Sequence, residues 1–167
     1  MSDSKAGAAS VRRPKAAGAR SAAAPYDRDV IRWSEQQARL LRAGRFAELD
    51  IEHLADEIED VGKSEKRELA NRMAVLLAHL LKWRWQPEKR SASWRRTIDH
   101  QRERIALLIK GTPSLKAVLG EKDWRQDMWL DAIAQASKET GIDEGAFPGA
   151  SPWDLNEALG ADFWPDS

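Results

Sequence analysis

Hydrophobic residues recur every three or four positions along most of the chain, which is the spacing that places them on one face of an α-helix. The first such segment predicts a helix over residues 26–44. Asp27 is expected to cap its start, and Gly44 is expected to end it. The residues predicted to face inward on this helix are Val30, Trp33, Gln37, Leu40 and Leu41.

A much longer apolar stripe follows and predicts the central helix of the fold. Asp50 is a suitable N-cap, and Pro87 is expected to end the helix. The stripe consists of Ile51, Leu54, Ile58, Val61, Leu69, Met73, Leu76, Leu80 and Trp83. Gly62 and Ser64 look locally like a stop and a new start, but steps of 3.6 residues pass through them without a slip. We therefore predict one long helix over about 50–85, because one internal glycine costs only about 1 kcal/mol relative to alanine.

The next periodic segment predicts a helix over about 93–110, which starts at Ser91 or Ser93 and ends at Gly111. The residues predicted to form its inward face are Trp94, Ile98, Gln101, Ile105, Leu108 and Ile109. Only a short connection separates this helix from the long one. We therefore expect it to return antiparallel to the long helix.

The remaining chain predicts shorter elements around one more long helix. A short turn or helix follows Pro113, the long helix stops at Gly141, and a short helix starts at Ser151 with Pro152 at its first position. The inward residues of the long one are Trp124, Met128, Ala132, Ile133 and Ala136. No segment shows the pattern of a β-strand. The predicted fold is therefore all-α, a helical bundle built on the long central helix without a β-sheet.

Length and composition predict how the chain is organised. Its 167 residues suffice for one domain with a real core, and we predict a single helical domain over 26–167. Residues 1–25 are rich in Ala, Arg and Ser and poor in large apolar residues, so we predict a disordered tail there. No run of about 18 apolar residues predicts a membrane span. The absence of cysteine excludes disulfides and thiolate chemistry, and it is compatible with the predicted cytoplasmic location.

Charge is distributed unevenly although the net charge is zero. Residues 26–61 carry five cations and ten anions, 62–110 carry thirteen and five, and 111–167 carry four and eleven. A basic middle between acidic flanks can form a polyanion site, or basic and acidic helices can pack side by side. We favour the second interpretation, because the acidic segments are the chain neighbours of the basic one.

Three short motifs resemble a known family. They are "LD-E-L--EIE--GKSEKREL" over 49–69, "HLLKW-W-PE-RS-SWR-TI" over 79–98, and "PSL" over 113–115. With these motifs the chain, from about Tyr26 onward, resembles the bacterial family known as domain of unknown function 29. The resemblance implies an all-helical domain, and it implies no established activity.

Histidines and carboxylates are the candidates for a metal site. His53, Glu57 and Asp60 share helical spacing, but the chain's three histidines do not converge by spacing alone. The low-ranked metal candidates are Glu57 and His79, which could meet only through the fold. We favour a solvated acidic face for the first set. For His79 we favour a boundary histidine bonded to the backbone or to a neighbouring tryptophan. No cofactor is predicted, and without a nucleophile or phosphate-binding motif the sequence does not favour an enzyme.

The basic, tryptophan-rich stretch over 82–96 is the candidate for a contact with a polyanion or a partner. Trp83 and Trp94 follow the apolar stripes and are expected in the core. Trp85 points away from the stripe. It either offers a stacking platform for a base, or packs under the loop at Pro87 or against the tryptophan-rich C-terminal part. Lys82 is expected beside these residues as a further cation able to hold phosphate. The candidate contact residues are Trp85, Arg84, Lys89, Arg90, Arg95 and Arg96.

These observations favour a cytoplasmic protein-interaction or regulatory module that binds a protein partner or itself. One alternative is a nucleic-acid-associated protein that uses the loop over 82–96. The second alternative is a metal-dependent enzyme of the helical-bundle kind, with Glu57 and His79 brought together by folding.

Overall fold

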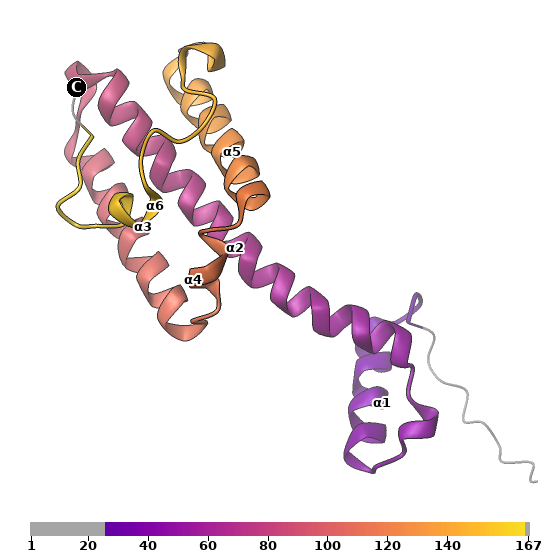
Figure 1. Ribbon diagram of the computed structural model, residues 1–167. Helices are drawn as coiled ribbons and strands as arrows, with labels where there is room; N and C mark the ends of the chain where they lie inside the picture. The colour runs from indigo at the N-terminus through magenta and orange to yellow at the C-terminus, as the bar shows by residue number, and fades with distance from the viewer. Residues whose placement is uncertain (1–25, 166–167) are drawn as a thin grey trace, which may run out of the picture. The chain divides into compact units, whose positions relative to one another are not determined.

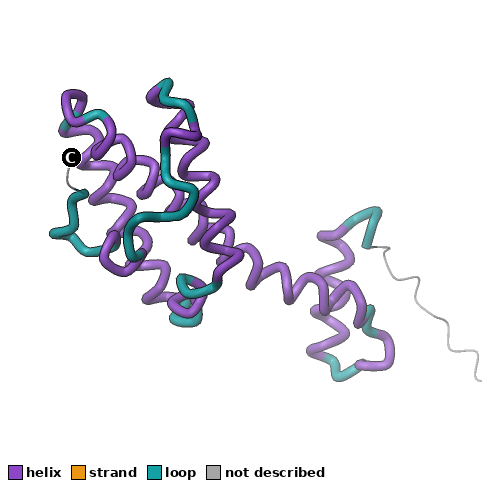
Figure 2. The backbone as a smooth tube through the Cα atoms, turned by 45° about the horizontal axis from the view of Figure 1, so that its top comes forward, coloured by secondary structure: helices purple, strands orange, loops and turns teal. Residues whose placement is uncertain are grey.

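The computed structural model describes residues 26–165, and the disordered tail predicted for 1–25 lies outside the described residues. Throughout the described part of the chain the regular elements are helices, so the all-α prediction is confirmed (Figure 2). The α-helices are α1 (Val30–Arg42), α2 (Ile51–Trp85), α3 (Ala92–Gly111), α4 (Leu115–Val118), α5 (Lys122–Thr140) and α6 (Leu155–Ala158). Three single 3-10 turns accompany them: η1 (Phe46–Glu48), η2 (Pro87–Lys89) and η3 (Glu144–Ala146). None of the helices over 26–165 combines the length and the apolar character that crossing a bilayer requires.

The described residues form two compact units, one ending at Ala55 and the other beginning at Asp56. We call residues 26–55 the N-terminal unit and residues 56–165 the C-terminal unit. Helix α2 begins in the first and continues into the second. The single domain predicted over 26–167 stays a prediction.

Helix α1 begins later than the sequence predicted. Asp29, and not Asp27, is the N-cap, and its carboxylate accepts a hydrogen bond from the backbone N–H of Arg32 at 3.0 Å. Asp27 lies two residues too early and belongs to the preceding turn. The predicted stop is correct, because the chain leaves the helix through Gly44 in a left-handed conformation, with φ of 68°.

Helix α2 is continuous over 35 residues, which confirms the predicted long helix. Asp50 caps its start, with a carboxylate oxygen 3.4 Å from the backbone nitrogen of His53. Gly62 lies inside the helix, and a Cβ added there would meet nothing within 4 Å. The helix ends before Pro87, where Gln86 leaves the helical region with φ of −134° and ψ of 64°, because a residue before proline disfavours helical geometry.

Helix α3 packs antiparallel to α2, as predicted. The hydroxyl of Thr112, just beyond the end of α3, lies 3.4 Å from the carboxylate of Glu65, early in α2. At the other end, the Lys82 ammonium lies 4.6 Å from the ring centre of Trp94, in the first turn of α3. Ser91 caps α3 by accepting a hydrogen bond from the Trp94 N–H.

Helix α5 packs along α2, which therefore lies between α3 and α5 (Figure 1). Lys66 contacts Glu121 at the start of α5, at 3.0 Å, and Lys82 contacts Glu139 near its end. Because these pairs rise together in sequence, α5 runs in the same direction as α2. Gly141 ends α5 with a φ of 75°, as predicted. The core between the three helices includes Leu69, Met73, Leu76, Leu77, Leu80, Ile98, Ile105, Met128, Trp129 and Ala132.

The last short helix begins three residues after the predicted start. Asp154 caps α6 by accepting hydrogen bonds from the backbone N–H groups of Asn156 and Glu157. Ser151 instead forms a turn, in which its hydroxyl accepts from the Trp153 N–H at 3.3 Å and donates to the Trp153 carbonyl at 2.9 Å. The sequence signal was misread because a capping serine and a turn serine form similar short bonds.

Arg102 ties the C-terminal segment to α3. Its guanidinium donates to the backbone carbonyls of Ala158 at 3.0 Å, Ala161 at 3.4 Å and Phe163 at 2.5 Å. The first of these carbonyls belongs to α6, which lies beside α3 (Figure 1). Burial lowers the pKa of Arg102, but the group keeps its charge, because an arginine pKa stays far above neutral pH.

Several apolar residues predicted to face inward are exposed, and this corrects the predicted core. They are Val30, Leu41, Ile51, Ile58 and Val61, with exposed fractions of 45–71%. In the N-terminal unit each helix has one other helix to pack against, so one stripe of each is covered. Residues 58 and 61 precede the part of α2 that α3 and α5 reach, since their ends contact Glu65 and Lys66.

Candidate functional site

Trp83 is built into the C-terminal unit. Its half-buried ring lies 4.6 Å from the ring of Trp164, centre to centre. The Arg90 guanidinium lies 5.2 Å from the Trp83 ring centre, and its Nε donates to the Trp83 carbonyl at 2.8 Å. Arg90, in the loop after α2, therefore bonds back to Trp83 in the last turn of that helix.

Trp85 packs against the C-terminal part of the chain, which is one of the interpretations that the sequence left open. Its half-buried ring lies 5.5 Å from that of Phe147, in an edge-to-face arrangement. The Arg84 guanidinium lies 5.0 Å from the Trp85 ring centre. Because the Trp85 ring contacts Phe147 and lies under the Arg84 guanidinium, its contacts are those of a residue that stabilises the fold.

The other cations of the predicted contact set are placed differently from one another. Arg95 lies 4.9 Å from the Trp164 ring centre. Lys89 and Arg96 are exposed, and within the described residues neither forms an ion pair shorter than 4.0 Å. The stretch over 82–96 therefore combines contacts with the C-terminal segment, contacts within the stretch itself and two exposed cations.

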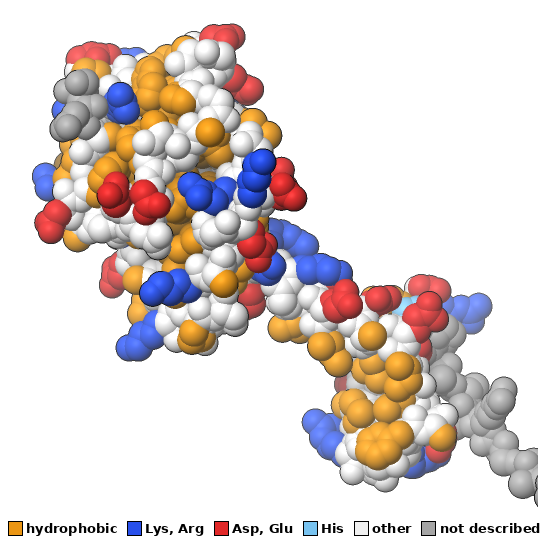
Figure 3. Space-filling model, in the orientation of Figure 1, with side chains coloured by type: hydrophobic (Ala, Val, Ile, Leu, Met, Phe, Trp, Pro, Cys, Tyr) orange, Lys and Arg blue, Asp and Glu red, His pale blue; other side chains and the backbone are white. Residues whose placement is uncertain are grey.

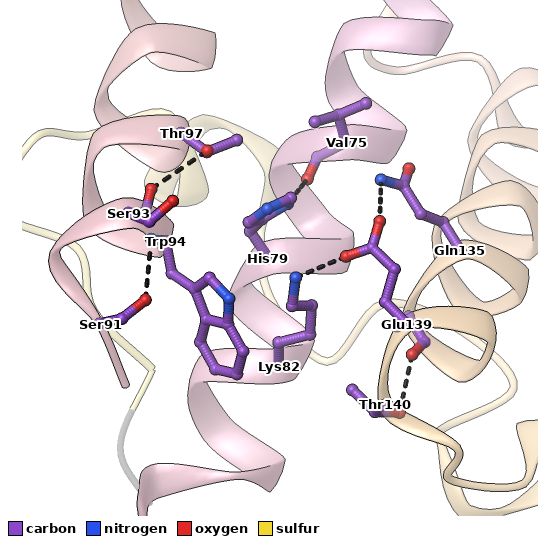
Figure 4. A network of polar contacts seen from close by, with 11 residues as sticks. Val75, His79, Lys82, Ser91, Ser93, Trp94, Thr97, Gln135, Glu139 and Thr140 are labelled. Atoms are coloured by element: carbon purple, nitrogen blue, oxygen red, sulfur yellow. Dashed lines mark hydrogen bonds and ion pairs between the residues drawn. The ribbon is translucent and has the colours of Figure 1, made fainter. Parts of the chain in front are cut away.

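Lys82 is buried, which corrects its predicted place among the cations available to phosphate. The residue is 5% exposed, and its ammonium lies 2.5 Å from a carboxylate oxygen of Glu139 on α5. Figure 4 shows it between the Trp94 indole on one side and Glu139 on the other. Gln135 donates a hydrogen bond of 2.9 Å to the second carboxylate oxygen of Glu139. This network joins α2, α3 and α5.

The two titratable groups of this network have shifted pKa values. Burial alone would raise the pKa of Glu139, but the hydrogen bonds from Lys82 and Gln135 outweigh it and hold that pKa below its usual value. Burial lowers the pKa of His79 more than its bond to the Val75 carbonyl raises it, and the nearby Lys82 charge lowers it further. His79 is therefore neutral at pH 7, with Nδ1 donating to that carbonyl at 2.9 Å. The predicted backbone-bonded boundary histidine is confirmed.

The metal candidates Glu57 and His79 do not meet. Both lie on α2, and the 22 residues between them correspond to about 33 Å of helix. Over residues 26–165, no group of three or more His, Asp or Glu side chains is arranged to hold a metal ion. The described part of the chain thus brings no third ligand to either residue.

A polar cluster holds the N-terminal unit together, and sequence spacing gave no sign of it. The Asp50 carboxylate accepts from the indole N–H of Trp33 at 3.0 Å and lies 2.8 Å from Nδ1 of His53. The Asp50 backbone N–H donates to the side-chain oxygen of Gln37 at 2.9 Å, and Tyr26 stacks on the His53 ring at 4.3 Å. The cluster joins α1, the start of α2 and the residues before α1.

Hydrogen bonding sets the charge states in this cluster. The hydrogen bond to Asp50 raises the pKa of His53 above its ordinary 6.5. Burial alone would raise the pKa of Asp50, but the bonds from His53 and Trp33 outweigh it and lower that pKa. The side-chain nitrogen of Gln37 is buried without a hydrogen-bond partner. The cluster caps the start of α2 and does not form an open site, because both oxygens of the Asp50 carboxylate bond to groups within the N-terminal unit.

One shallow pocket opens beside the start of α5. Its volume is about 250 Å³, and its floor is formed by Met128, Trp129 and Leu155. Lys122 and Arg125 are the cations among its lining residues. None of the polar side chains that line it is buried. The pocket therefore offers solvated charges and no fixed polar group that would orient a ligand.

The N-terminal unit exposes five large apolar side chains to solvent. We call these residues the docking face: Val30, Ile31, Leu41, Phe46 and Ile51, with exposed fractions of 48, 70, 45, 64 and 62%. Val30 and Leu41 are 11 residues apart, close to three full turns, so they share one side of α1. Figure 3 shows hydrophobic side chains gathered on one side of this unit.

The fold and contacts thus describe an all-helical protein with an exposed apolar surface. The family model described as "Domain of unknown function DUF29" matches residues 25–164, which is most of the 167-residue chain, and the chain belongs to this family. No curated protein and no solved structure gives a significant match. The family resemblance seen in the motifs is confirmed, and the family description assigns no activity.

Proposed function

We propose that this chain is a cytoplasmic protein-interaction module whose contact surface is the docking face. The observation that supports the proposal is an imbalance within residues 26–55. Among their apolar side chains only Trp33 and Leu40 are buried, whereas the five of the docking face are 45–70% exposed. Exposed apolar side chains that gather on one side of a unit, as in Figure 3, are typical of protein contact sites. The absence of cysteine supports a reducing location.

Size adds to this support. Helical units of fewer than about 40 residues rarely bury enough apolar surface to be stable without a metal, a disulfide or an oligomeric partner. The 167 residues contain no cysteine for a disulfide. A protein that covers the docking face would supply the missing burial.

The other two hypotheses receive no comparable support. A nucleic-acid surface needs exposed rings beside cations, but Trp83 and Trp85 pack against Trp164 and Phe147. A metal-dependent enzyme needs convergent ligands, and the described residues bring Glu57 and His79 no closer than α2 allows.

Site-specific photocrosslinking tests the proposal. A benzoylphenylalanine is placed at Phe46 of the full chain in living bacterial cells, and at Leu130, which is 52% exposed on α5, as the matched control. We expect a protein adduct at position 46 that is absent at position 130. The crosslinked protein is then purified, and its affinity for the chain is measured by calorimetry.

Ile31→Glu should weaken that affinity at least tenfold, because a charge replaces an apolar contact, whereas Leu130→Glu should leave it unchanged. Equal adducts at both positions, or an adduct with nucleic acid at position 46, would overturn the proposal.

A further inference from the structure

We propose that the partner of the docking face is a second copy of this chain, an inference that rests on the proposed function. In such a dimer the two N-terminal units meet face to face about a two-fold axis. Each contributes α1 and the first turns of α2, so the contact has the composition of a four-helix bundle. The apolar face that one copy leaves open is then covered by the same face of the other.

The charge of the N-terminal unit fits a second copy. Residues 26–55 carry six carboxylates and five arginines, a net charge of −1. Two such units approach each other without strong repulsion. A polyanion or a strongly basic peptide would gain little from so weak a net charge.

The charges are also segregated in a self-complementary way. Helix α1 carries Arg32, Arg39 and Arg42 against a single carboxylate, Glu35. Residues 48–52 carry three carboxylates and no cation. Glu48 pairs with Arg45, and Asp50 bonds to Trp33 and His53, so Glu52 is the carboxylate of this segment that is left for a partner. In a two-fold contact the arginines of α1 in one copy can face Glu52 of the other, and the same pairing then occurs twice.

The composition of the docking face matches the centre of a protein interface. Phe46 supplies an aromatic side chain that is 64% exposed, and the other four residues of the docking face are aliphatic. Arg32 and Arg42 directly follow Ile31 and Leu41 in the sequence, and arginine is enriched in protein interfaces. A stable interface typically buries about 800 Å² on each partner, which requires the rim as well as the apolar centre. We therefore expect affinity in the micromolar range rather than a permanent dimer.

Sedimentation of the full chain over about 1–200 µM tests the inference. We expect a monomer–dimer equilibrium for the native chain. The double variant Ile31→Glu with Phe46→Glu should raise the dissociation constant at least tenfold, because four introduced carboxylates would meet at the contact. The matched controls are Leu107→Glu and Leu130→Glu, each at a site 52% exposed in the C-terminal unit, and they should dimerise as the native chain does. Far-ultraviolet circular dichroism verifies that each variant keeps its helices.

The outcomes separate this inference from the proposed function. A native chain that stays monomeric at 200 µM overturns the dimer, and so do control variants that lose dimerisation as strongly as the docking-face variant. If crosslinking at position 46 then traps a different protein, the proposed function stands and only the second copy is rejected. If position 46 gives no adduct above position 130, both are rejected.

Discussion

The ammonium of Lys82 lies 2.5 Å from a carboxylate oxygen of Glu139 and 4.6 Å from the ring centre of Trp94. The buried Lys82 ammonium on α2 therefore contacts both α3 and α5. A buried ion pair adds little stability compared with apolar residues of the same size, but removing one partner leaves the other charge uncompensated.

Glu139→Ala should thus destabilise the protein by about 2 kcal/mol, less than for a fully buried pair because the Glu139 side chain is 36% exposed. Lys82→Met should cost less than about 1 kcal/mol, since the apolar part of the side chain keeps its packing. Urea unfolding of the two variants measures the difference. Glu103→Ala, at an exposed position of α3, is the control, and equal losses for the two network variants would contradict the interpretation.

Two histidines should give the two units opposite responses to pH. The pKa of His53 is raised above 6.5, so its contact with Asp50 stabilises the N-terminal unit fully below that value. This stabilisation is lost as the pH rises through the folded-state pKa. Burial lowers the pKa of His79, so the contribution of this residue to the stability of the C-terminal unit is complete above pH 6.5. That contribution is lost as the pH falls from 6.5 through the lower folded-state pKa.

Titration by nuclear magnetic resonance reads both pKa values directly. We expect the pKa of His53 above 6.5 and the pKa of His79 below it. In His79→Gln the acid-side loss of stability in the C-terminal unit should disappear. A His79 pKa above that of His53 would show that the assignment is wrong.

Arg102 should control the order of the C-terminal segment. Arg102→Met removes three hydrogen bonds from a charged donor to backbone carbonyls, and we expect a loss of about 3 kcal/mol. Amide hydrogen exchange over 155–163 should accelerate more than exchange in the middle of α2. Arg104→Met, an exposed position on the same helix, should change neither. Uniform acceleration along the whole chain would argue against a local role for Arg102.

Substitution of Trp85 distinguishes a role in fold stability from a role in nucleic-acid binding. Because its ring packs against Phe147, Trp85→Ala should reduce the stability of the C-terminal unit by about 2 kcal/mol. A stacking platform would behave differently, with unchanged stability and a lower affinity for oligonucleotides. Fluorescence titration with single-stranded and duplex oligonucleotides at low and moderate salt measures that affinity, and urea unfolding measures the stability. Salt-sensitive binding that depends on Trp85 would revive the nucleic-acid hypothesis.

The fold could be predicted where the physical cause is local. Helix α2 was predicted across Gly62 because the apolar phase is a property of successive residues and does not depend on the tertiary structure. Capping was less certain, since Asp27 and Asp29 have the same side chain two residues apart and only the backbone decides between them.

Burial and pairing could not be predicted with the same success. A periodic stripe shows which side of a helix is apolar, but not whether another element reaches it, as Ile58 and Val61 demonstrate. Lys82 and Glu139 are 57 residues apart, so their pairing depends on how α5 is placed against α2. The burial of Arg102 could have been predicted from its spacing. It follows Ile98 by four residues and so lies on the inward side of α3, where a charge requires a partner.

Arg102 also determines where the chain can be shortened. A truncation that removes Ala161 and Phe163 would leave a buried guanidinium with one of its three carbonyl partners. Trp164, which rests on that guanidinium and on Arg95, would be lost as well. The short final turn is therefore as necessary to the C-terminal unit as a core helix, although it contains little regular structure of its own.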